Sequence, residues 1–338
     1  MVAPELITEE SARLMSAFNE LQSVASTRIR IGSNWPLFEL FSDRMELPKR
    51  TVDAYIMPIV NSAIKLKRNG GNTQNEDCNN GITSLLDYLV SHTDDPIQIR
   101  DTLLAFLLAG RDTTASLLTF VTYALSLHPD VYQRLEAEIN EVATVDDMIT
   151  FDDIKHMRYL RATMNETLRL FPPVPFNIRR STSVSSVLPS VLSRVPGGLY
   201  MYPRCSVTFS PLHIHRRKDL WGNDAEEFRP ERWLGENSTK VHVTNPFAFF
   251  PFNGGPRMCL GQNLAYLLVS QTVIKLVREF TWDLSPTHQP ALVPTRWKGQ
   301  PGRKGIERCW PKAALTLYSD KGLFILLRKK GEATAKTE

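Results

Sequence analysis

The sequence lacks the features that define several broad classes of protein. It has only 4 cysteines in 338 residues (Cys78, Cys205, Cys259 and Cys309), and their wide spacing excludes both a disulfide framework and a zinc cluster. Lys and Arg number 40 against 36 Asp and Glu, and the small formal net charge of +4 gives no indication of a nucleic-acid-binding surface. With 42% hydrophobic and 22% charged residues, the composition also excludes collagen-like and wholly disordered chains.

Long hydrophobic runs are missing too. The first thirty residues are rich in glutamate and contain no apolar run that could serve as a signal peptide or anchor. The most apolar stretches, Thr102–Gly110 and Thr113–Leu127, are divided by Arg111 and Asp112, and each is shorter than the roughly 18–20 residues that cross a bilayer. We therefore expect a long helix buried in a protein core, in a chain that is soluble or at most sits on a membrane surface.

Hydrophobic periodicity predicts a mainly helical chain with a minor β component. Short β-branched pieces near 184–195 and 207–210 suggest small hairpins, and the stretches 315–318 and 322–327 predict a terminal hairpin. The Gly- and Asn-rich segment 69–81 predicts a flexible surface loop. Apolar spacings of three and four predict helices in these segments: 9–67 with proline interruptions, 82–91, 96–127, 131–142, 152–170 and 262–280.

The segment from Phe252 to Gly261 reads Phe-Asn-Gly-Gly-Pro-Arg-Met-Cys-Leu-Gly and leads into a predicted helix. Unsatisfied N–H groups at a helix N-terminus favour the thiolate of a cysteine placed just before them, here Cys259. Gly254 and Gly255 let the backbone turn tightly and approach a flat ligand closely. The alternative is a buried structural cysteine in a glycine-rich turn.

This segment resembles the haem-binding loop of the cytochrome P450 family, Phe-x-x-Gly-x-Arg-x-Cys-x-Gly, at five positions: Phe252, Gly255, Arg257, Cys259 and Gly261. The resemblance implies a cytochrome P450 fold, mainly α with minor β. It also implies that haem, iron protoporphyrin IX, is the cofactor, with the Cys259 thiolate as the axial ligand of the iron. Three further motifs occur in the family's order.

The second motif is Ala-Gly-Arg-Asp-Thr-Thr at 109–114, inside the apolar helix. The adjacent charged residues Arg111 and Asp112 are costly to bury there unless they are paired or functional. The alternative is a helix with one solvent-exposed turn. The motif resembles the distal helix of the family, which implies that Asp112 and Thr113 are the catalytic pair that relays protons. The same resemblance implies that Ala109 and Gly110 leave room beside the haem.

The third and fourth motifs are Glu-Thr-Leu-Arg at 166–169 and Phe-Arg-Pro-Glu-Arg-Trp at 228–233. A spacing of three puts Glu166 and Arg169 on one helix face, where an ordinary surface ion pair is the alternative. They resemble the Glu-x-x-Arg helix of the family, whose implied third partner here is Arg232. The resemblance implies a structural role, in which the three residues fix the segment that presents Cys259.

Two arginines and two histidines complete the candidate residues. The resemblance implies that Arg179 and Arg257 bind the haem propionates, since a guanidinium group suits carboxylates; the alternative for each is a solvated surface arginine. His213 and His215 would share a face of a strand, but no third ligand lies nearby in the sequence. We therefore interpret them as surface or core histidines.

The family resemblance implies a haem–thiolate monooxygenase that inserts one O2-derived oxygen into a small apolar substrate. Segments 109–114 and 219–233 are similar to those of fungal alkane and fatty-acid hydroxylases, which suggests a long-chain alkane, fatty acid or aromatic hydrocarbon. The implied electron donor is NADPH through NADPH–cytochrome P450 reductase. Arg216, Arg217 and Lys218 are candidates for steering that partner, with solvated side chains as the alternative.

Two other functions are weighed against this one. A haem–thiolate enzyme that works without a reductase is disfavoured by the presence of Asp112 and Thr113. The other alternative is a truncated, catalytically silent haem-binding remnant, because the resemblance begins near the family's middle helices. We interpret residues 1–338 as the C-terminal two thirds of a single cytochrome P450 domain. The full-length form is expected at the endoplasmic reticulum membrane, held there only by the missing N-terminal part. The present chain alone is expected to bind haem weakly or fold poorly.

Overall fold

The computed structural model describes residues 8–69, 84–142, 149–190, 195–235, 245–286, 294–300 and 303–331. The segment 69–81, predicted as a flexible loop, lies outside the described residues from position 70 on. Contacts divide the chain into two compact units, Met1–Arg111 and Asp112–Glu338, which are described separately below. The prediction of a single domain over residues 1–338 stays a prediction.

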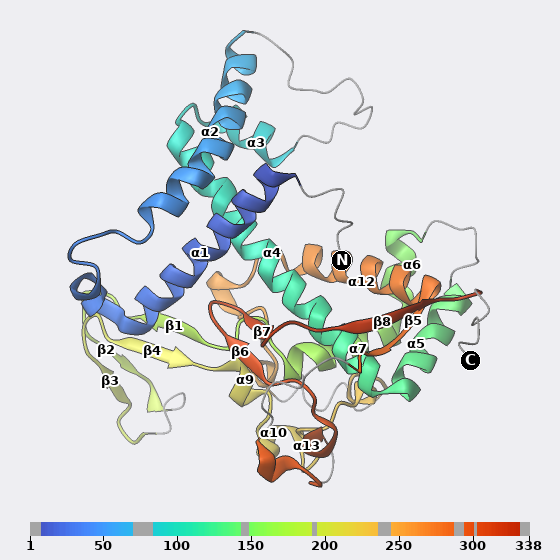
Figure 1. Cartoon of the computed structure of the whole chain (residues 1–338). Helices are drawn as coiled ribbons and strands as arrows, with labels where there is room; N and C mark the ends of the chain where they lie inside the picture. Colours follow the sequence, from blue (N-terminus) through green and yellow to red (C-terminus); the bar gives the residue numbers. More distant parts are fainter. Residues whose placement is uncertain are drawn as a thin grey trace. The chain divides into compact units, whose positions relative to one another are not determined.

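Helices make up most of the described chain, as predicted (Figure 1). The longer helices are α1 (Glu9–Ile31), α2 (Glu46–Arg68), α3 (Leu85–His92), α4 (Pro96–Leu127), α5 (Pro129–Val142), α6 (Phe151–His156), α7 (Arg158–Leu170) and α12 (Gln262–Glu279). Single-turn helices are α9 (Pro211–Ile214), α10 (Lys218–Trp221) and α13 (Arg303–Ile306). The 3-10 helices are η2 (Gly32–Phe38), η3 (Pro230–Trp233), η4 (Pro246–Ala248), η5 (Gly255–Arg257) and η6 (Thr295–Trp297).

Side-chain caps explain where several helices begin. Ser84 and Asp87 form a reciprocal capping box at the start of α3, and Thr150 and Asp153 form another at the start of α6. The predicted helix over 152–170 is two helices, because the backbone leaves helical geometry at Met157, with φ −74° and ψ 84°. This break separates α6 from α7, and α7 carries the Glu-x-x-Arg motif.

The first unit contains α1, α2, α3 and the first part of α4. Its apolar core includes Val60 and Ile64 from α2, Val90 from α3 and Ile99 from α4, all buried. Arg28 donates to Glu39 at 2.5 Å and to Asp43 at 2.6 Å, which ties the end of α1 to the segment before α2.

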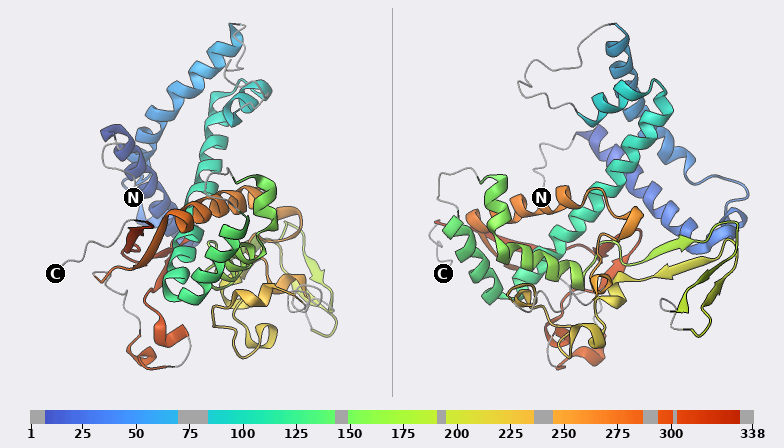
Figure 2. Two further views of the ribbon diagram at one scale, coloured as in Figure 1. Left: turned by 90° about the vertical axis from the view of Figure 1, so that its right-hand side faces the viewer. Right: turned by 180° about the vertical axis from the view of Figure 1, so that it is seen from behind.

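The second unit holds the larger core. Phe120 of α4, Leu135 of α5, Leu160 of α7 and Val273 of α12 are all at most 2% exposed and belong to one apolar cluster. Figure 2 shows α12 beside α5 and α6, in agreement with their contacts. Burial of this apolar surface supplies the main stabilisation of the unit that carries the haem-loop motif.

The strands form two-stranded antiparallel sheets: β1 (Asn177–Arg180) with β4 (Ser206–Phe209), β2 (Ser186–Leu188) with β3 (Leu199–Met201), β5 (Phe280–Leu284) with β8 (Ile325–Lys329), and β6 (Pro311–Ala313) with β7 (Leu317–Ser319). The predicted terminal hairpin is therefore wrong, because β8 and β7 pair with different strands. Trp282 at the centre of β5 is buried, and Ile325 of β8, which pairs with Leu284, packs against the same apolar core, so pairing with β5 brings the start of β8 to an apolar surface.

Helix α4 is only partly buried, contrary to the prediction of a core helix throughout. Its C-terminal half, which includes Leu117, Phe120 and Val121, belongs to the core of the second unit. Residues 105–110 are exposed, and they include the large side chain of Phe106 at 52%. Among the described residues α4 alone is long and apolar enough to cross a membrane, but this is weak support for a span, because core helices pass the same test.

Candidate functional site

Glu166 and Arg169 form a buried ion pair on α7. Arg169 donates from Nε to Oε2 and from Nη2 to Oε1 of Glu166, each at 2.8 Å, and both side chains are 0% exposed. The spacing of three brings the two groups onto one face, as predicted. Complete burial excludes the alternative of an ordinary surface ion pair.

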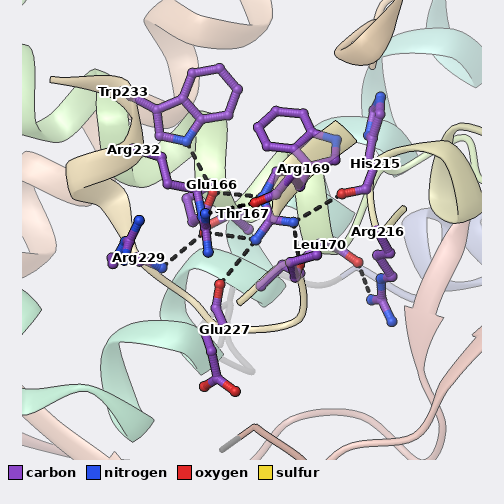
Figure 3. A network of polar contacts seen from close by, with 12 residues as sticks. Glu166, Thr167, Arg169, Leu170, His215, Arg216, Glu227, Arg229, Arg232 and Trp233 are labelled. Carbon is purple, nitrogen blue, oxygen red and sulfur yellow. Dashed lines mark hydrogen bonds and ion pairs between the residues drawn. The ribbon is translucent and has the colours of Figure 1, made fainter. Parts of the chain in front are cut away.

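Arg169 has all of its guanidinium N–H groups engaged (Figure 3). Beyond Glu166, it donates to the backbone carbonyl of His215 at 2.9 Å, to that of Ala225, and to that of Glu227 at 2.9 Å. Because guanidinium has five N–H donors, no donor of this buried cation is left unsatisfied. The side chain therefore connects α7 to the chain between α9 and η3.

Arg232 of η3 is the third member of the network. Its Nε donates to Glu166 Oε1 at 3.2 Å, and its Nη1 donates to Asp224 Oδ1 at 3.0 Å. Burial acts to raise the pKa of Asp224, but the hydrogen bond and charge of Arg232 and the charge of Arg229 outweigh it and lower that pKa. The carboxylates of Glu166 and Asp224 thus face the two buried guanidinium groups. This pairing offsets the desolvation free energy that burial of the charges costs.

Glu166 also accepts hydrogen bonds from the Arg229 backbone N–H at 2.9 Å and from Trp233 Nε1 at 3.0 Å. The Trp233 ring packs against Phe249 with ring centroids 4.5 Å apart. Phe249 lies three residues before Phe252, the first residue of the haem-loop motif. The network and the loop are therefore neighbours in the second unit.

The loop over 252–261 is shaped by its own backbone hydrogen bonds. Cys259 N–H donates to the carbonyl of Phe252 at 2.9 Å, and Met258 N–H donates to that of Gly255 at 3.0 Å. Gly255 has φ +70°, a conformation that glycine adopts without strain. The Phe252 ring packs on Tyr266 of α12 with centroids 5.3 Å apart, so the loop is anchored to the helix that follows it.

Cys259 is exposed, two residues before the last residue ahead of α12, Gly261, which offers no side-chain cap to the helix N-terminus. The surface beside it is apolar: Leu260 is 95% exposed, Leu264 58% and Met258 54%. Large exposed apolar side chains beside a sulfur suit a large apolar group that also offers a metal ion better than a small polar one. The residues present therefore fit haem, and the alternative of a buried structural cysteine is excluded.

The predicted distal residues lie on α4. Asp112 and Thr113 are half-buried and begin the second unit, whereas Ala109 and Gly110 are exposed and belong to the first unit. A Cβ added at Gly110 would meet nothing within 4 Å, so the structure shows open space at that position. The catalytic role of Asp112 and Thr113 stays a prediction.

The two predicted propionate ligands are both exposed. Arg179 lies on β1, where it pairs with Val207 and lies over the Phe209 ring at 5.4 Å. Arg257 ends η5, two residues before Cys259. An amide hydrogen bond of 3.5 Å from Asn253 to Asn177 joins the loop to the start of β1. The strand that carries Arg179 therefore contacts the loop that carries Arg257.

The two histidines have different environments, on a short helix and its turn rather than on a strand. His213 on α9 is exposed, with Nδ1 2.8 Å from the Ser210 hydroxyl, whereas His215 is 0% exposed. Within the described parts of the chain, no group of three or more His, Cys, Asp or Glu side chains could hold a metal ion. The exposure of His213 and the burial of His215 agree with their interpretation as surface or core histidines.

Sequence reasoning missed Asp224, His215 and Trp233 as members of the network. Only Trp233 had a local signal, because it is the last residue of the fourth motif and adjoins Arg232. Asp224 and His215 lie 58 and 49 positions from Glu166, and no periodicity links them to it.

Comparison with solved structures defines the fold. The crystal structure of the cytochrome P450DA heme domain matches with a TM-score of 0.66 at 20% identity, over 94% of this chain and 61% of that one. The family model of cytochrome P450 matches residues 5–304. The chain belongs to the cytochrome P450 family, as the four motifs predicted, and its mainly helical fold is the fold of that family.

Curated relatives are fungal. Cytochrome P450 52E1 of Candida apicola is 40% identical over 57% of this chain and 37% of its own length. Cytochrome P450 52A3-A of Candida maltosa is 35% identical over 78% of this chain and 50% of its own length. Cytochrome P450 monooxygenase g430 of a Fusarium species is 34% identical over 79% of this chain and 46% of its own length. The chain thus spans half or less of the length of these relatives. The family binds haem through a cysteine thiolate, and Cys259 as that cysteine stays a prediction from the loop motif.

Proposed function

We propose that this chain is a haem–thiolate monooxygenase with Cys259 as the iron ligand. The observation that carries the proposal is the exposed Cys259 side chain on a hydrogen-bonded loop, surrounded by apolar side chains and followed directly by a helix N-terminus. Bound haem would supply the activation of dioxygen at this place. Phe252, Gly255 and Gly261 shape the loop, and Arg257 and Arg179 offer cations to the propionates.

The substrate class that we propose is a long-chain alkane, a fatty acid or an aromatic hydrocarbon. One oxygen atom enters a C–H bond to give an alcohol, the other leaves as water, and NADPH supplies the electron pair. Asp112 and Thr113 hold and pass the protons that this balance requires. The support comes from the second motif and its place on α4, together with the fungal relatives.

The proposed electron source is NADPH–cytochrome P450 reductase. Of the three cations considered for steering it, Arg217 pairs with Asp219, and Arg216 donates to the Leu170 carbonyl. Lys218 is exposed. We therefore keep Lys218 as the candidate contact. The family resemblance also suggests the endoplasmic reticulum membrane as the location of the full-length form, which fractionation of cells expressing the tagged full-length protein tests.

Haem reconstitution tests the ligand. The chain loaded with haem, reduced and exposed to carbon monoxide should show the red-shifted Soret band of a thiolate-ligated haem. Cys259→Ser should abolish this band, and Cys205→Ser, a half-buried cysteine on another loop, should keep it. A thiolate band that survives Cys259→Ser would overturn the ligand assignment.

A turnover assay tests the reaction. The loaded chain, reductase and NADPH are supplied with isotope-labelled dioxygen and, in separate runs, an alkane, a fatty acid and a polycyclic aromatic. We expect a labelled alcohol from at least one substrate and a loss of at least tenfold in Asp112→Asn. A normal thiolate band without product from any substrate would instead support the catalytically silent haem-binding remnant.

A further inference from the structure

His215 lies where the buried ion-pair network meets the chain that leads to Cys259. Its carbonyl accepts from Arg169 Nη1 at 2.9 Å, and its ring Nε2 accepts the backbone N–H of Phe250 at 3.0 Å. The ring is fully buried and packs against Phe249 and Phe250, with centroid distances of 5.2 and 5.3 Å. One residue therefore contacts both the network and the entrance of the loop, with a separate atom for each.

Phe250 is held from both sides. While His215 accepts its N–H, its carbonyl accepts from Asn253 N–H at 3.0 Å, and this turn leaves Asn253 with φ +62°. Phe252 then accepts the N–H of Cys259 at 2.9 Å. A short series of hydrogen bonds thus runs from Arg169 through His215 and the Phe250 turn to the backbone of Cys259.

The hydrogen bond requires a neutral imidazole. A ring nitrogen that accepts cannot carry a proton, so the neutral ring has its hydrogen on Nδ1. Burial, followed by the positive charge of Arg169, lowers the pKa of His215 to about 3; Arg216 adds to this, and the carbonyls of Leu168 and Arg169 oppose it. The acceptor is therefore available throughout the neutral range.

We propose that His215 is a positioning residue that holds the start of the Cys259 loop against α7 by accepting the Phe250 N–H. That the loop presents a haem ligand rests on the proposed function, but the hydrogen bond itself does not. The role belongs to the acceptor at the Nε2 position rather than to the volume of the ring, and this distinction makes the proposal testable.

Amide hydrogen exchange at Phe250 in the full chain without haem provides the first test. His215→Gln places an amide oxygen near the Nε2 position, whereas the shorter His215→Asn withdraws it. We expect wild type and His215→Gln to protect Phe250 within about threefold of each other, and His215→Asn to exchange at least about tenfold faster. The exposed histidine provides the control, because His213→Gln should leave exchange unchanged. Equal exchange in His215→Asn and wild type, or equal acceleration in both His215 variants, would overturn the proposal.

A second measurement needs no variant and decides the matter if His215→Asn does not fold. Nitrogen NMR of histidine-labelled wild type should show one ring, absent in His215→Gln, that stays in the neutral Nδ1–H tautomer when the pH is lowered below about 6.5, the ordinary pKa of histidine. A protonated ring or the Nε2–H tautomer would contradict the proposal.

The thiolate band of the haem-loaded chain then separates the positioning role of His215 from the proposed haem ligation by Cys259. His215→Asn should give a smaller fraction of thiolate-type reduced carbonyl band than His215→Gln, and equal fractions would show that the bond does not position Cys259. If wild type gives no thiolate band, the proposed function fails, while the exchange and NMR results still decide the role of His215.

Discussion

The buried network around Glu166 and the loop around Cys259 are opposite in character, although both belong to the second unit. Glu166 and Arg169 are charged and fully buried, whereas Leu260 is apolar and 95% exposed. Each arrangement reverses the usual preference of its residue types. The network satisfies its charges within the chain, and the loop offers apolar surface and a sulfur outward. The comparison indicates that the network serves the geometry of the fold and the loop serves a ligand.

The largest expected effect comes from removing one charge of the network. Glu166→Gln keeps the shape of the side chain but leaves Arg169 buried without its carboxylate, which should cost about 3–5 kcal/mol of unfolding free energy. Urea unfolding of the chain measures it. The exposed pair of Glu46 and Arg50, at 2.5 Å, provides the control, since Glu46→Gln should cost only about 0.3–0.5 kcal/mol. Similar losses in both variants would show that burial does not distinguish the network.

Acid should lower the unfolding free energy of the chain, because His215 binds a proton more readily when the chain is unfolded. Its pKa is about 3 in the folded chain and about 6.5 when unfolded, so the unfolded chain binds the extra proton between these values. Stability is therefore intact above about pH 6.5 and falls as the pH decreases, by about 1.4 kcal/mol per pH unit for this group. Unfolding of wild type and His215→Gln between about pH 7 and 5 should show a shallower slope in the variant. Part of the slope should remain, because burial also lowers the pKa of His128. Identical slopes would rule out the assigned titration.

A smaller effect is expected from one neutral donor to Glu166. Trp233→Phe removes the N–H that donates to Oε2 at 3.0 Å but keeps an aromatic ring against Phe249. A hydrogen bond to a buried charge contributes about 1.5–3 kcal/mol, and we expect a loss near the lower value. Trp310→Phe, at a partly exposed tryptophan that packs on Trp297, should change the unfolding free energy by less than about 0.5 kcal/mol. A Trp233 variant as stable as wild type would mean that this donor is dispensable.

The smallest effect on stability is expected at the loop. Leu260→Ala should change the unfolding free energy of the haem-free chain by less than about 0.5 kcal/mol, because the side chain is almost fully exposed. The same change at the buried Leu160 should cost about 2–5 kcal/mol. Haem release from the loaded chain should nevertheless be several-fold faster in Leu260→Ala. Unchanged release would separate Leu260 from the proposed haem surface.

Local pattern was sufficient to locate most of the helices and the motif residues. Spacing of three placed Glu166 and Arg169 on one face of α7, and the four motifs identified the family that the comparisons confirm. These features depend on residues within one or two turns of each other, which the sequence displays directly. The break at Met157 and the exposure of 105–110 were not predicted, because the apolar spacing continues through both places.

Contacts between distant segments were decided only by the tertiary structure. The segments 315–318 and 322–327 were predicted to pair with each other, yet β7 and β8, which overlap them, each pair with another strand, because strand pairing depends on the surface that is buried rather than on nearness in sequence. Likewise, the sequence marked Cys259 and the triad of Glu166, Arg169 and Arg232, but it could not show that Asp224 balances the charge or that His215 accepts from Phe250. The residue types and their short spacings define which chemistry the chain carries. The burial that neutralises His215 and closes the network arises only when segments about 50 residues apart fold against each other.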